Sequence, residues 1–292
     1  MNKSKKSIFL FLLPALVIYL SVVALPVFST AYNSFFKWNL VDTKKYVGIK
    51  NFIQLFTIDS IFKTSLTNTL LLLVLSILIQ VPGAIALALA ITRTVKGSRY
   101  YKTVYFMPNI LASVAVGLLW SFVYNPEFGI INRLLGAVGL ESAKGLWLAD
   151  QKAVLPCIMV VICWQFIGYH MIIYLAAIEN IPQSLIEIAT IDGANTRQRI
   201  FHIILPLIKP IIRIDTVLIA TGSLRYFDLI YVMSNGGPSH SSEVMALYMY
   251  YKSFRDMQYG YGSSIALVLL IMCLAVTVIL NKLLKSEDVQ FY

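Results

Sequence analysis

The sequence is poor in charged residues: only 13% of its 292 residues are Asp, Glu, Lys or Arg, whereas 58% are hydrophobic. Soluble domains carry about a quarter charged residues. This composition excludes an ordinary water-soluble protein and indicates that lipid surrounds most of the chain. Cysteine is scarce too, and Cys157, Cys163 and Cys273 lie in apolar segments without the spacing of a disulfide framework or a metal site. We interpret them as small core residues.

The sequence also lacks the marks of an enzyme. It has no G-x-x-x-x-G-K-[ST] loop for nucleotide phosphates, so we expect no ATP chemistry in this chain. His170, His202 and His240 lie in three different segments, and each is better explained as a hydrogen-bonded single residue than as a metal ligand. We expect no cofactor. We also expect no nucleic-acid partner, because the positive residues behind the net charge of +10 are spread between apolar runs. A membrane-embedded enzyme would need a clustered set of reactive groups, which the sequence does not show.

Long apolar runs are what the sequence has in abundance. A helix needs about 20 residues to cross ~30 Å of hydrocarbon. Six runs are long enough, and we predict an all-α membrane protein with about six transmembrane helices. The first run is too long for a signal peptide and has no clear cleavage site, so we expect it to be retained. The predicted spans are 8–32, 66–91, 103–124, 154–178, 206–226 and 263–284.

The distribution of positive charge predicts the orientation of these spans. With both termini in the cytoplasm, the inner segments hold 13 Lys and Arg in 64 residues, and the outer segments hold 10 in 97. This difference follows the positive-inside tendency. We therefore predict a multi-pass protein of the cell membrane with both termini cytoplasmic. Its expected parts are a tail, first helix and outer loop (1–65), a five-helix core (66–285) and a short cytoplasmic tail (286–292).

The segment 179–205, between the fourth and fifth spans, predicts a docking element. It contains a helix start at Pro182, a turn at Asp192-Gly193 and a second short helix over about 195–204. Glycine suits the turn because it accepts backbone angles that other residues avoid. Two amphipathic helices outside the bilayer could bind a partner, and a linker helix lying on the membrane surface would have the same composition. The second helix should be continuous with the fifth span.

These loop residues carry a resemblance to a known family. Glu187-Ile188-Ala189, Asp192-Gly193-Ala194 and Ile203-Ile204-Leu205-Pro206 resemble the EAA signature of ABC importer permeases. Other stretches, in order along nearly the whole chain, resemble the sugar-transporting branch: Gly48-x-x-Asn51-Phe52, Asn68-Thr69, Tyr105-x-x-Pro108, Trp164-Gln165-x-x-Gly168-Tyr169, Phe227-Asp228 and Gly236-Gly237-Pro238. The resemblance implies the type I ABC importer permease fold, with the loop 179–205 as the coupling loop that docks in a groove of a cytoplasmic ATPase.

The resemblance also implies which residues act. For ATPase coupling it points to Glu187, Ala189, Asp192, Gly193, Ala194, Arg197 and Ile200, and Glu187 suits a charge-assisted pair with a basic residue of the ATPase. The family usually has Ala where this chain has Ile188, and often aromatics at Arg197 and Ile200, which leaves the choice of ATPase open. For the substrate pathway it points to Gln165, Phe166, Tyr169, Gly222, Ser223 and Tyr226. Interfacial aromatic belts and helix packing are the competing explanations for these six.

Three charges near the spans need partners. Asp215 lies about two turns inside the fifth predicted span, where a charge is costly, and Arg213 or a partner subunit could neutralise it. Arg225 and Asp228 have the spacing i, i+3 and predict a local ion pair. The alternative is that Arg225 meets an anionic substrate.

By resemblance, the chain would lie in the lipid bilayer and work with three partners. These are a second related permease, two copies of a cytoplasmic ATPase and an extracytoplasmic substrate-binding protein. The predicted function is import of a sugar or oligosaccharide, with a polyol or a sugar phosphate as alternative cargo. An ion-coupled secondary transporter is the alternative from another class. It would need acidic residues or unwound helices within the membrane, and only Asp215 qualifies.

Overall fold

The structure is a computed structural model that describes residues 5–92 and 97–285. Its described part forms two compact units, which we treat separately: one contains the residues up to Lys63 together with Tyr248–Ile271, and the other contains Thr64–Leu247 and the residues from Met272. The predicted tail 286–292 lies outside the described residues. The described elements are α1 (Lys5–Tyr19), η1 (Leu20–Ala24), α2 (Leu25–Asn33), β1 (Phe36–Lys37), β2 (Lys45–Tyr46), α3 (Lys50–Thr57), α4 (Ser60–Ala90), α5 (Ser98–Ile110), α6 (Ser113–Val123), α7 (Ile130–Ala137), η2 (Glu141–Ala143), η3 (Trp147–Ala149), α8 (Val154–Glu179), α9 (Gln183–Ile191), α10 (Thr196–Arg199), η4 (Ile200–Ile204), α11 (Leu205–Leu224), α12 (Asp228–Met233), α13 (Met245–Tyr250), η5 (Tyr251–Arg255) and α14 (Tyr259–Leu283).

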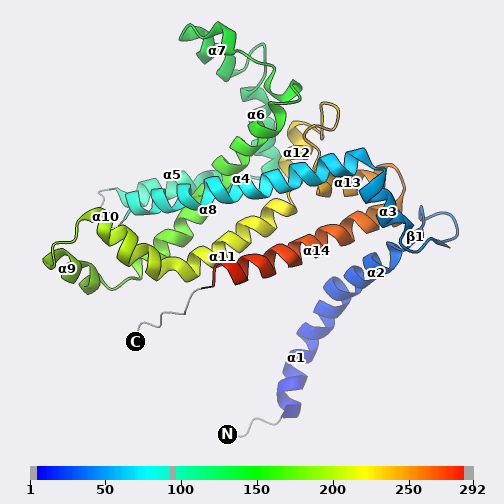
Figure 1. Cartoon of the computed structure of the whole chain (residues 1–292), viewed down its shortest axis with the longest axis horizontal. Coiled ribbons are helices and arrows are strands. Elements are labelled where there is room, and N and C mark those ends of the chain that lie inside the picture. Colours follow the sequence, from blue (N-terminus) through cyan, green and yellow to red (C-terminus); the bar gives the residue numbers. More distant parts are fainter. Residues whose placement is uncertain (1–4, 93–96, 286–292) are drawn as a thin grey trace. The chain divides into compact units, whose positions relative to one another are not determined.

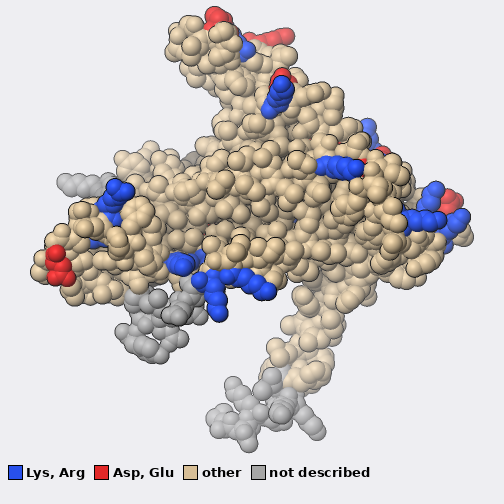
Figure 2. All heavy atoms as spheres, viewed as in Figure 1, with Lys and Arg blue, Asp and Glu red and all other residues tan. Residues whose placement is uncertain are grey.

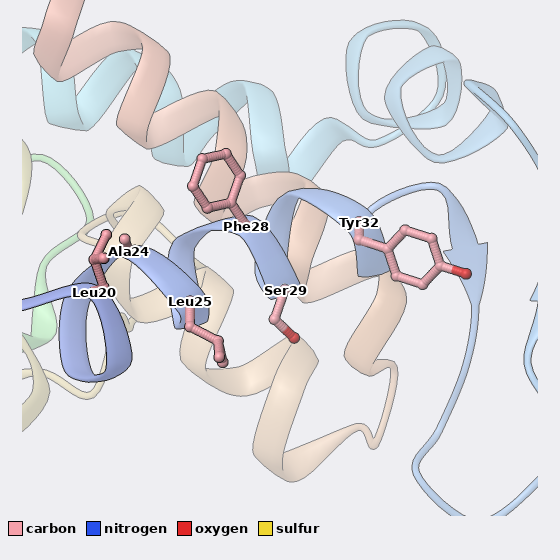
Figure 3. Close-up of a pocket in the computed structure, with 6 residues that line it drawn as sticks. All are labelled: Leu20, Ala24, Leu25, Phe28, Ser29 and Tyr32. Atoms are coloured by element: carbon pink, nitrogen blue, oxygen red, sulfur yellow. The ribbon is translucent and has the colours of Figure 1, made fainter. Parts of the chain in front are cut away.

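The first unit begins with a long apolar helix. The elements α1, η1 and α2 follow one another without a break, and the residues Phe9–Asn33 form a candidate membrane span whose most apolar stretch has no buried residue. A surface groove of about 500 Å³ runs along this helix, and the side chains that line it come from η1 and α2 (Figure 3). Such an apolar surface requires lipid or another apolar helix around it. The groove is lined by Leu20, Ala24, Leu25, Phe28, Ser29 and Tyr32.

A small β-hairpin in the first unit contacts the start of α14. Strands β1 and β2 pair antiparallel, with Phe36 opposite Tyr46. The backbone N–H of Gly260 donates to the carbonyl of Trp38 at 3.0 Å. A Cβ atom at Gly260 would lie 1.9 Å from the Phe36 carbonyl oxygen, so only glycine allows this close approach. The hairpin is therefore held by backbone contacts.

The second unit is organised around α8. This helix packs against α5 and α11 (Figure 1). Its apolar core includes Ala84 and Ala88 from α4, Met171 and Tyr174 from α8, and Ile208 from α11. These side chains form one buried apolar cluster between α4, α8 and α11.

Close contact between α5 and α8 depends on one glycine. A Cβ atom at Gly168 would lie 1.8 Å from the carbonyl oxygen of Tyr105 and 2.4 Å from its carbonyl carbon. Small residues at a helix interface let two backbones approach in the membrane. Gly168 therefore sets the distance between α5 and α8.

Two motifs that are far apart in the sequence meet in this unit. The side-chain amide of Asn68 donates to the carbonyls of Ser241 and Glu243 at 2.9 and 2.8 Å. The backbone N–H of Met245 donates to the Thr69 hydroxyl at 3.0 Å. The Asn68-Thr69 pair thus holds the loop that follows Gly236-Gly237-Pro238.

The third predicted span, 103–124, is wrong as a continuous helix. Helices α5 and α6 are bent by 96° at the break between them (Figure 1). Leu111 and Ala112 have extended ψ angles of 141° and 131°. Pro108 removes a backbone donor just before the break. The two halves also pack on different partners, α5 on α8 and α6 on α12.

The other predicted spans are helical. Four helices of the described chain are long and apolar enough to cross a membrane: Phe9–Asn33, α4, α8 and α14; the bent pair α5 and α6 raises this number to five. On the face shown in Figure 2, most of α4 carries no charge, and its sequence has none after Lys63. Helix α11 lies where the fifth span was predicted, but it carries Lys209, Arg213 and Asp215. It is therefore less suited to direct exposure to lipid than the other four.

We predict that Gly168→Ala separates α5 from α8. The added methyl group would overlap the Tyr105 carbonyl, and overpacking of this kind costs about 1–3 kcal/mol. The expected result is a lower melting temperature of the purified protein in detergent. Gly222→Ala is the matched control, because no atom lies within 4 Å of a Cβ at that position. Equal melting temperatures for the two variants would contradict the packing described.

Candidate functional site

A cavity of about 510 Å³, with both apolar and polar groups in its wall, lies within the second unit. Residues from α4, α5, α6, α8 and α11 line it, together with the segment between α11 and α12. The cavity is large enough for a small-molecule ligand. Its lining residues are Gln80, Asn109, Ser113, Ile162, Phe166, Tyr169, His170, Leu218, Ile219, Gly222, Ser223, Arg225, Tyr226, Phe227 and Asp228.

The structure brings together five of the six residues predicted for the substrate pathway. Phe166 and Tyr169 from α8 line the same cavity as Gly222, Ser223 and Tyr226. The sixth residue, Gln165, is 1% exposed and is absent from the lining. Its side-chain amide instead donates to the Leu111 carbonyl at 3.4 Å, at the break between α5 and α6. The role of these six residues in transport stays a prediction.

The cavity wall combines aromatic rings with polar groups. The rings of Phe166 and Tyr226 meet edge to face, with centroids 6.0 Å apart. Tyr169 and His170 form a second edge-to-face pair at 5.1 Å. Amide side chains and hydroxyl groups lie on the same wall. Such a wall can stack on an apolar ligand face and form hydrogen bonds around its edge.

Sequence reasoning missed three polar residues of the cavity: Gln80, Asn109 and Ser113. Gln80 is buried inside an otherwise apolar span. A polar side chain within a span usually faces an aqueous cavity or the interior of a bundle. That signal was sufficient to find Gln80. Asn109 and Ser113 depend on the break in the third span, which the sequence analysis treated as continuous.

The predicted ion pair between Arg225 and Asp228 does not form among the described residues. The spacing i, i+3 places two side chains together only on a continuous helix. Helix α11 ends at Leu224 and α12 begins at Asp228, so Arg225 lies outside both. The Arg225 Nε atom donates to the Thr221 carbonyl at 3.1 Å. Both charged side chains line the cavity.

Asp215 finds its partner on α8. Its Oδ1 atom lies 2.8 Å from Nδ1 of His170, and Asp215 is fully buried. Arg213, which the sequence offered as a neutralising residue, has a buried Nε atom without a partner. Each of the other two histidines also has a hydrogen-bond partner: His202 at the Gln198 carbonyl and His240 at Glu243.

The loop 179–205 folds as two short helices joined by a tight turn, as predicted. Gly193 has a φ angle of +82°, and the N–H of Ala194 donates to the Ala189 carbonyl at 2.9 Å. Asn195 and Gln198 form a reciprocal capping box at the start of α10. Helices α10, η4 and α11 then continue without a break, which confirms the predicted continuity with the fifth span.

The surface of this loop includes exposed apolar side chains. Ile191 is 84% exposed, and Ile188 and Phe201 are more than half exposed. Exposed apolar groups beside charged ones mark a protein interaction site. Figure 2 shows acidic side chains over the same end of the molecule as α9. Of the seven predicted coupling residues, Glu187, Asp192, Gly193 and Arg197 are exposed, and Ala189, Ala194 and Ile200 are half-buried.

Two contacts make the loop rigid. The Arg199 guanidinium donates through Nη1 to the Thr190 hydroxyl at 2.8 Å and so joins α10 to α9. Glu179, the last residue of α8, forms an ion pair with Lys102 of α5 at 2.9 Å. The loop therefore begins at a fixed point on the α5–α8 pair.

A bundle of apolar helices around a cavity with polar groups in its wall, and with an exposed loop at one end, is an arrangement expected of the membrane subunit of a transporter. The chain belongs to the family described as "Binding-protein-dependent transport system inner membrane component", whose model matches residues 80–286. It is therefore an integral membrane permease component of a binding-protein-dependent ABC importer. ATP hydrolysis belongs to a separate subunit of such an importer. The predicted family and fold class are confirmed.

Individual relatives agree with this assignment over nearly their whole length. The chain is 36% identical to the "Probable ABC transporter permease protein YurN" of Bacillus subtilis, over 98% of both chains. It is 30% identical to the "Multiple sugar-binding transport system permease protein MsmF" of Streptococcus mutans, over 96% of this chain and 95% of the relative. A solved bacterial ABC transporter that imports the acidic polysaccharide alginate matches with a TM-score of 0.84 at 25% identity, over 97% of this chain and 96% of that chain.

We predict that Lys102→Glu weakens the attachment of α5 to the end of α8. The change places two carboxylates side by side, and a partly buried pair of this kind contributes about 1 kcal/mol. The melting temperature in detergent should fall. The double variant Lys102→Glu with Glu179→Lys should recover most of the loss, because the opposite charges are restored. A double variant no more stable than Lys102→Glu alone would show that the ion pair contributes nothing.

Proposed function

We propose that the chain imports a sugar or oligosaccharide and that the cavity is its passage. The observation that carries the proposal is a wall of aromatic rings, amides and hydroxyls inside a membrane bundle. A sugar ring has an apolar C–H face for stacking and hydroxyl groups around its edge. Relatives support this class: their names include starch degradation products in Thermoanaerobacterium thermosulfurigenes and diacetylchitobiose in Streptomyces coelicolor.

Within the cavity, each residue type has a distinct role in the proposal. Phe166, Tyr169 and Tyr226 stack on the sugar, and Ser223 with the amides of α4 and α5 binds its hydroxyls. Gly222 leaves open space, since no atom lies within 4 Å of its Cβ position. Arg225 and Asp228 are both available to a cargo. Arg225 would bind a cargo that carries a carboxylate. The matched transporter is one involved in the import of an acidic polysaccharide.

The loop 179–205 is proposed as the coupling element. Ile188, Ile191 and Phe201 supply the apolar contact with the ATPase, and Glu187 and Arg197 supply charge-assisted bonds at its edge. The Gly193 turn sets the angle between the two helices. A motion of the ATPase reaches α11 directly, because α10, η4 and α11 form one continuous helix.

The proposed orientation places this loop and both termini in the cytoplasm. The segments that then lie inside carry about twice the density of Lys and Arg of the outer segments. A second related permease, two copies of the ATPase and an extracytoplasmic binding protein complete the assembly. The exposed groove on the first helix (Figure 3) offers an apolar surface for lipid or for a helix of the second permease.

Ion-coupled transport is not supported. It rested on Asp215 as an acidic residue within a span, and that residue is engaged with His170 and has no exposed surface. A coupling ion must reach its ligands from water at some stage of transport.

We predict that Glu187→Ala lowers the amount of ATPase that co-purifies with the tagged chain. Loss of a charge-assisted hydrogen bond costs about 1.5–3 kcal/mol, which corresponds to roughly a tenfold to hundredfold weaker association. Gly193→Val should have a similar effect, because a β-branched residue is strained at a φ of +82°. Glu127→Ala removes an exposed carboxylate from the loop between α6 and α7 and is the control. Undiminished co-purification of both loop variants would exclude the coupling assignment.

We predict that Gly222→Leu blocks uptake without unfolding the chain. The open space at Gly222 admits the larger side chain, which then fills part of the cavity. Uptake of labelled mono-, di- and oligosaccharides by cells that carry the whole importer should fall at least tenfold for every sugar transported by the wild type. Melting temperature and ATPase association should stay unchanged. Normal uptake by a stably folded Gly222→Leu variant would show that cargo passes elsewhere.

A further inference from the structure

The pair formed by His170 and Asp215 lies where a charge is most costly. His170 belongs to α8 and Asp215 to α11, both in the membrane bundle, and the two are buried. Their Nδ1 and Oδ1 atoms are 2.8 Å apart. His170 also lines the cavity, whereas Asp215 does not. The histidine therefore stands between a hidden carboxyl group and the cavity.

The surroundings of Asp215 leave the histidine as its compensating group. Among the described residues, His170 is the one that forms an ion pair with Asp215. Lys209 and Arg213 lie on the same helix and form no such pair with it in the described structure. The buried Tyr174 hydroxyl lies near the Asp215 carboxyl group, and neither it nor the Asp215 Oδ2 atom forms a hydrogen bond of good geometry. A net negative charge at this place would be strongly unfavourable.

Two protonation states make the pair neutral overall. In the first, the imidazolium donates from Nδ1 to the Asp215 carboxylate, and both ring nitrogens carry a proton. In the second, the protonated carboxyl group of Asp215 donates to Nδ1, and the neutral ring then carries its single proton on Nε2. Both states place a proton on Nε2. A bare Nε2 requires a neutral ring that donates from Nδ1. The acceptor would then be an ionised Asp215, which leaves the net negative charge, or the carbonyl oxygen of a protonated Asp215, which leaves the carboxyl proton on the buried Oδ2 atom without a hydrogen bond of good geometry.

We propose that His170 presents an Nε2–H donor to the cavity and that Asp215 is the positioning residue that fixes it there. The proposal rests on the proposed function of the cavity as the cargo passage. A fixed donor selects a cargo with an acceptor oxygen at that point, such as the hydroxyl, ring or carboxyl oxygen of a saccharide. It also explains a buried carboxyl group inside a span, which packing alone does not require.

The protonation of the ring can be measured without knowing the cargo. The chain has three histidines, and His202→Gln with His240→Gln leaves His170 as the one histidine to observe. The side-chain ¹⁵N spectrum of this variant, labelled with [¹⁵N]histidine and reconstituted in bilayers, should show a protonated Nε2 from pH 6.5 to 8. The further change His170→Gln identifies the signal by erasing it. An unprotonated Nε2 in the folded protein overturns the proposal, whatever the uptake of Gly222→Leu shows.

The positioning role of Asp215 has a separate readout. Asp215→Leu removes the partner of Nδ1, so the ring should become a mixture of tautomers. His170→Gln keeps an N–H donor and should retain uptake within about threefold of the wild type, whereas His170→Leu should lose about tenfold. Equal uptake by the Gln and Leu variants, at equal melting temperature, overturns the role of the donor toward cargo. If Gly222→Leu also transports normally, the cavity assignment has failed instead.

Discussion

Polar groups without partners are the main constraint on this structure, because hydrocarbon offers no water to bind them. An unsatisfied backbone group in the bilayer costs several kcal/mol. The helical fold satisfies most groups within each helix. Where the chain departs from a helix, at Leu111 between α5 and α6, the side chain of Gln165 supplies a donor for the exposed carbonyl. The same constraint explains why the buried Asp215 carboxyl group forms a hydrogen bond with His170.

Helix α8 connects the cavity of the second unit with the loop 179–205. Its middle carries Phe166, Tyr169 and His170 on the cavity wall, and its end carries Glu179 directly before the loop. Gly168, between these positions, brings the backbone of α5 into contact. One helix thus contacts the cavity, the α5 half of the bent pair α5–α6 and the beginning of the loop 179–205. Changes at any of these places are transmitted through packed atoms.

The sequence was most informative where structure is determined locally. The two helices of the loop and their turn follow from Pro182, Gly193 and the capping residues, all within a few positions of one another. Apolar length was enough to find four spans, Phe9–Asn33, α4, α8 and α14. The resemblance of motifs along the chain gave the family, and it also selected five residues that line one cavity.

The features that the sequence could not provide depend on distant contacts. The bend after Leu111 arises because α5 and α6 pack on different helices. The partner of Asp215 lies 45 positions away, on α8. The prediction of an Arg225–Asp228 ion pair was wrong for a local reason, because α11 ends at Leu224, before both residues. Helix ends are the least certain part of any prediction from sequence.

The unbroken course of α10, η4 and α11 has a mechanical consequence. From Thr196 to Gly222 the helix extends about 40 Å at a rise of about 1.5 Å per residue. A stiff rod of this length acts as a lever: a tilt of about 10° about one end displaces the other by about 7 Å, more than one helical turn. Under the coupling role proposed for the loop, a modest change of angle there would displace residues at the cavity by a distance of this order.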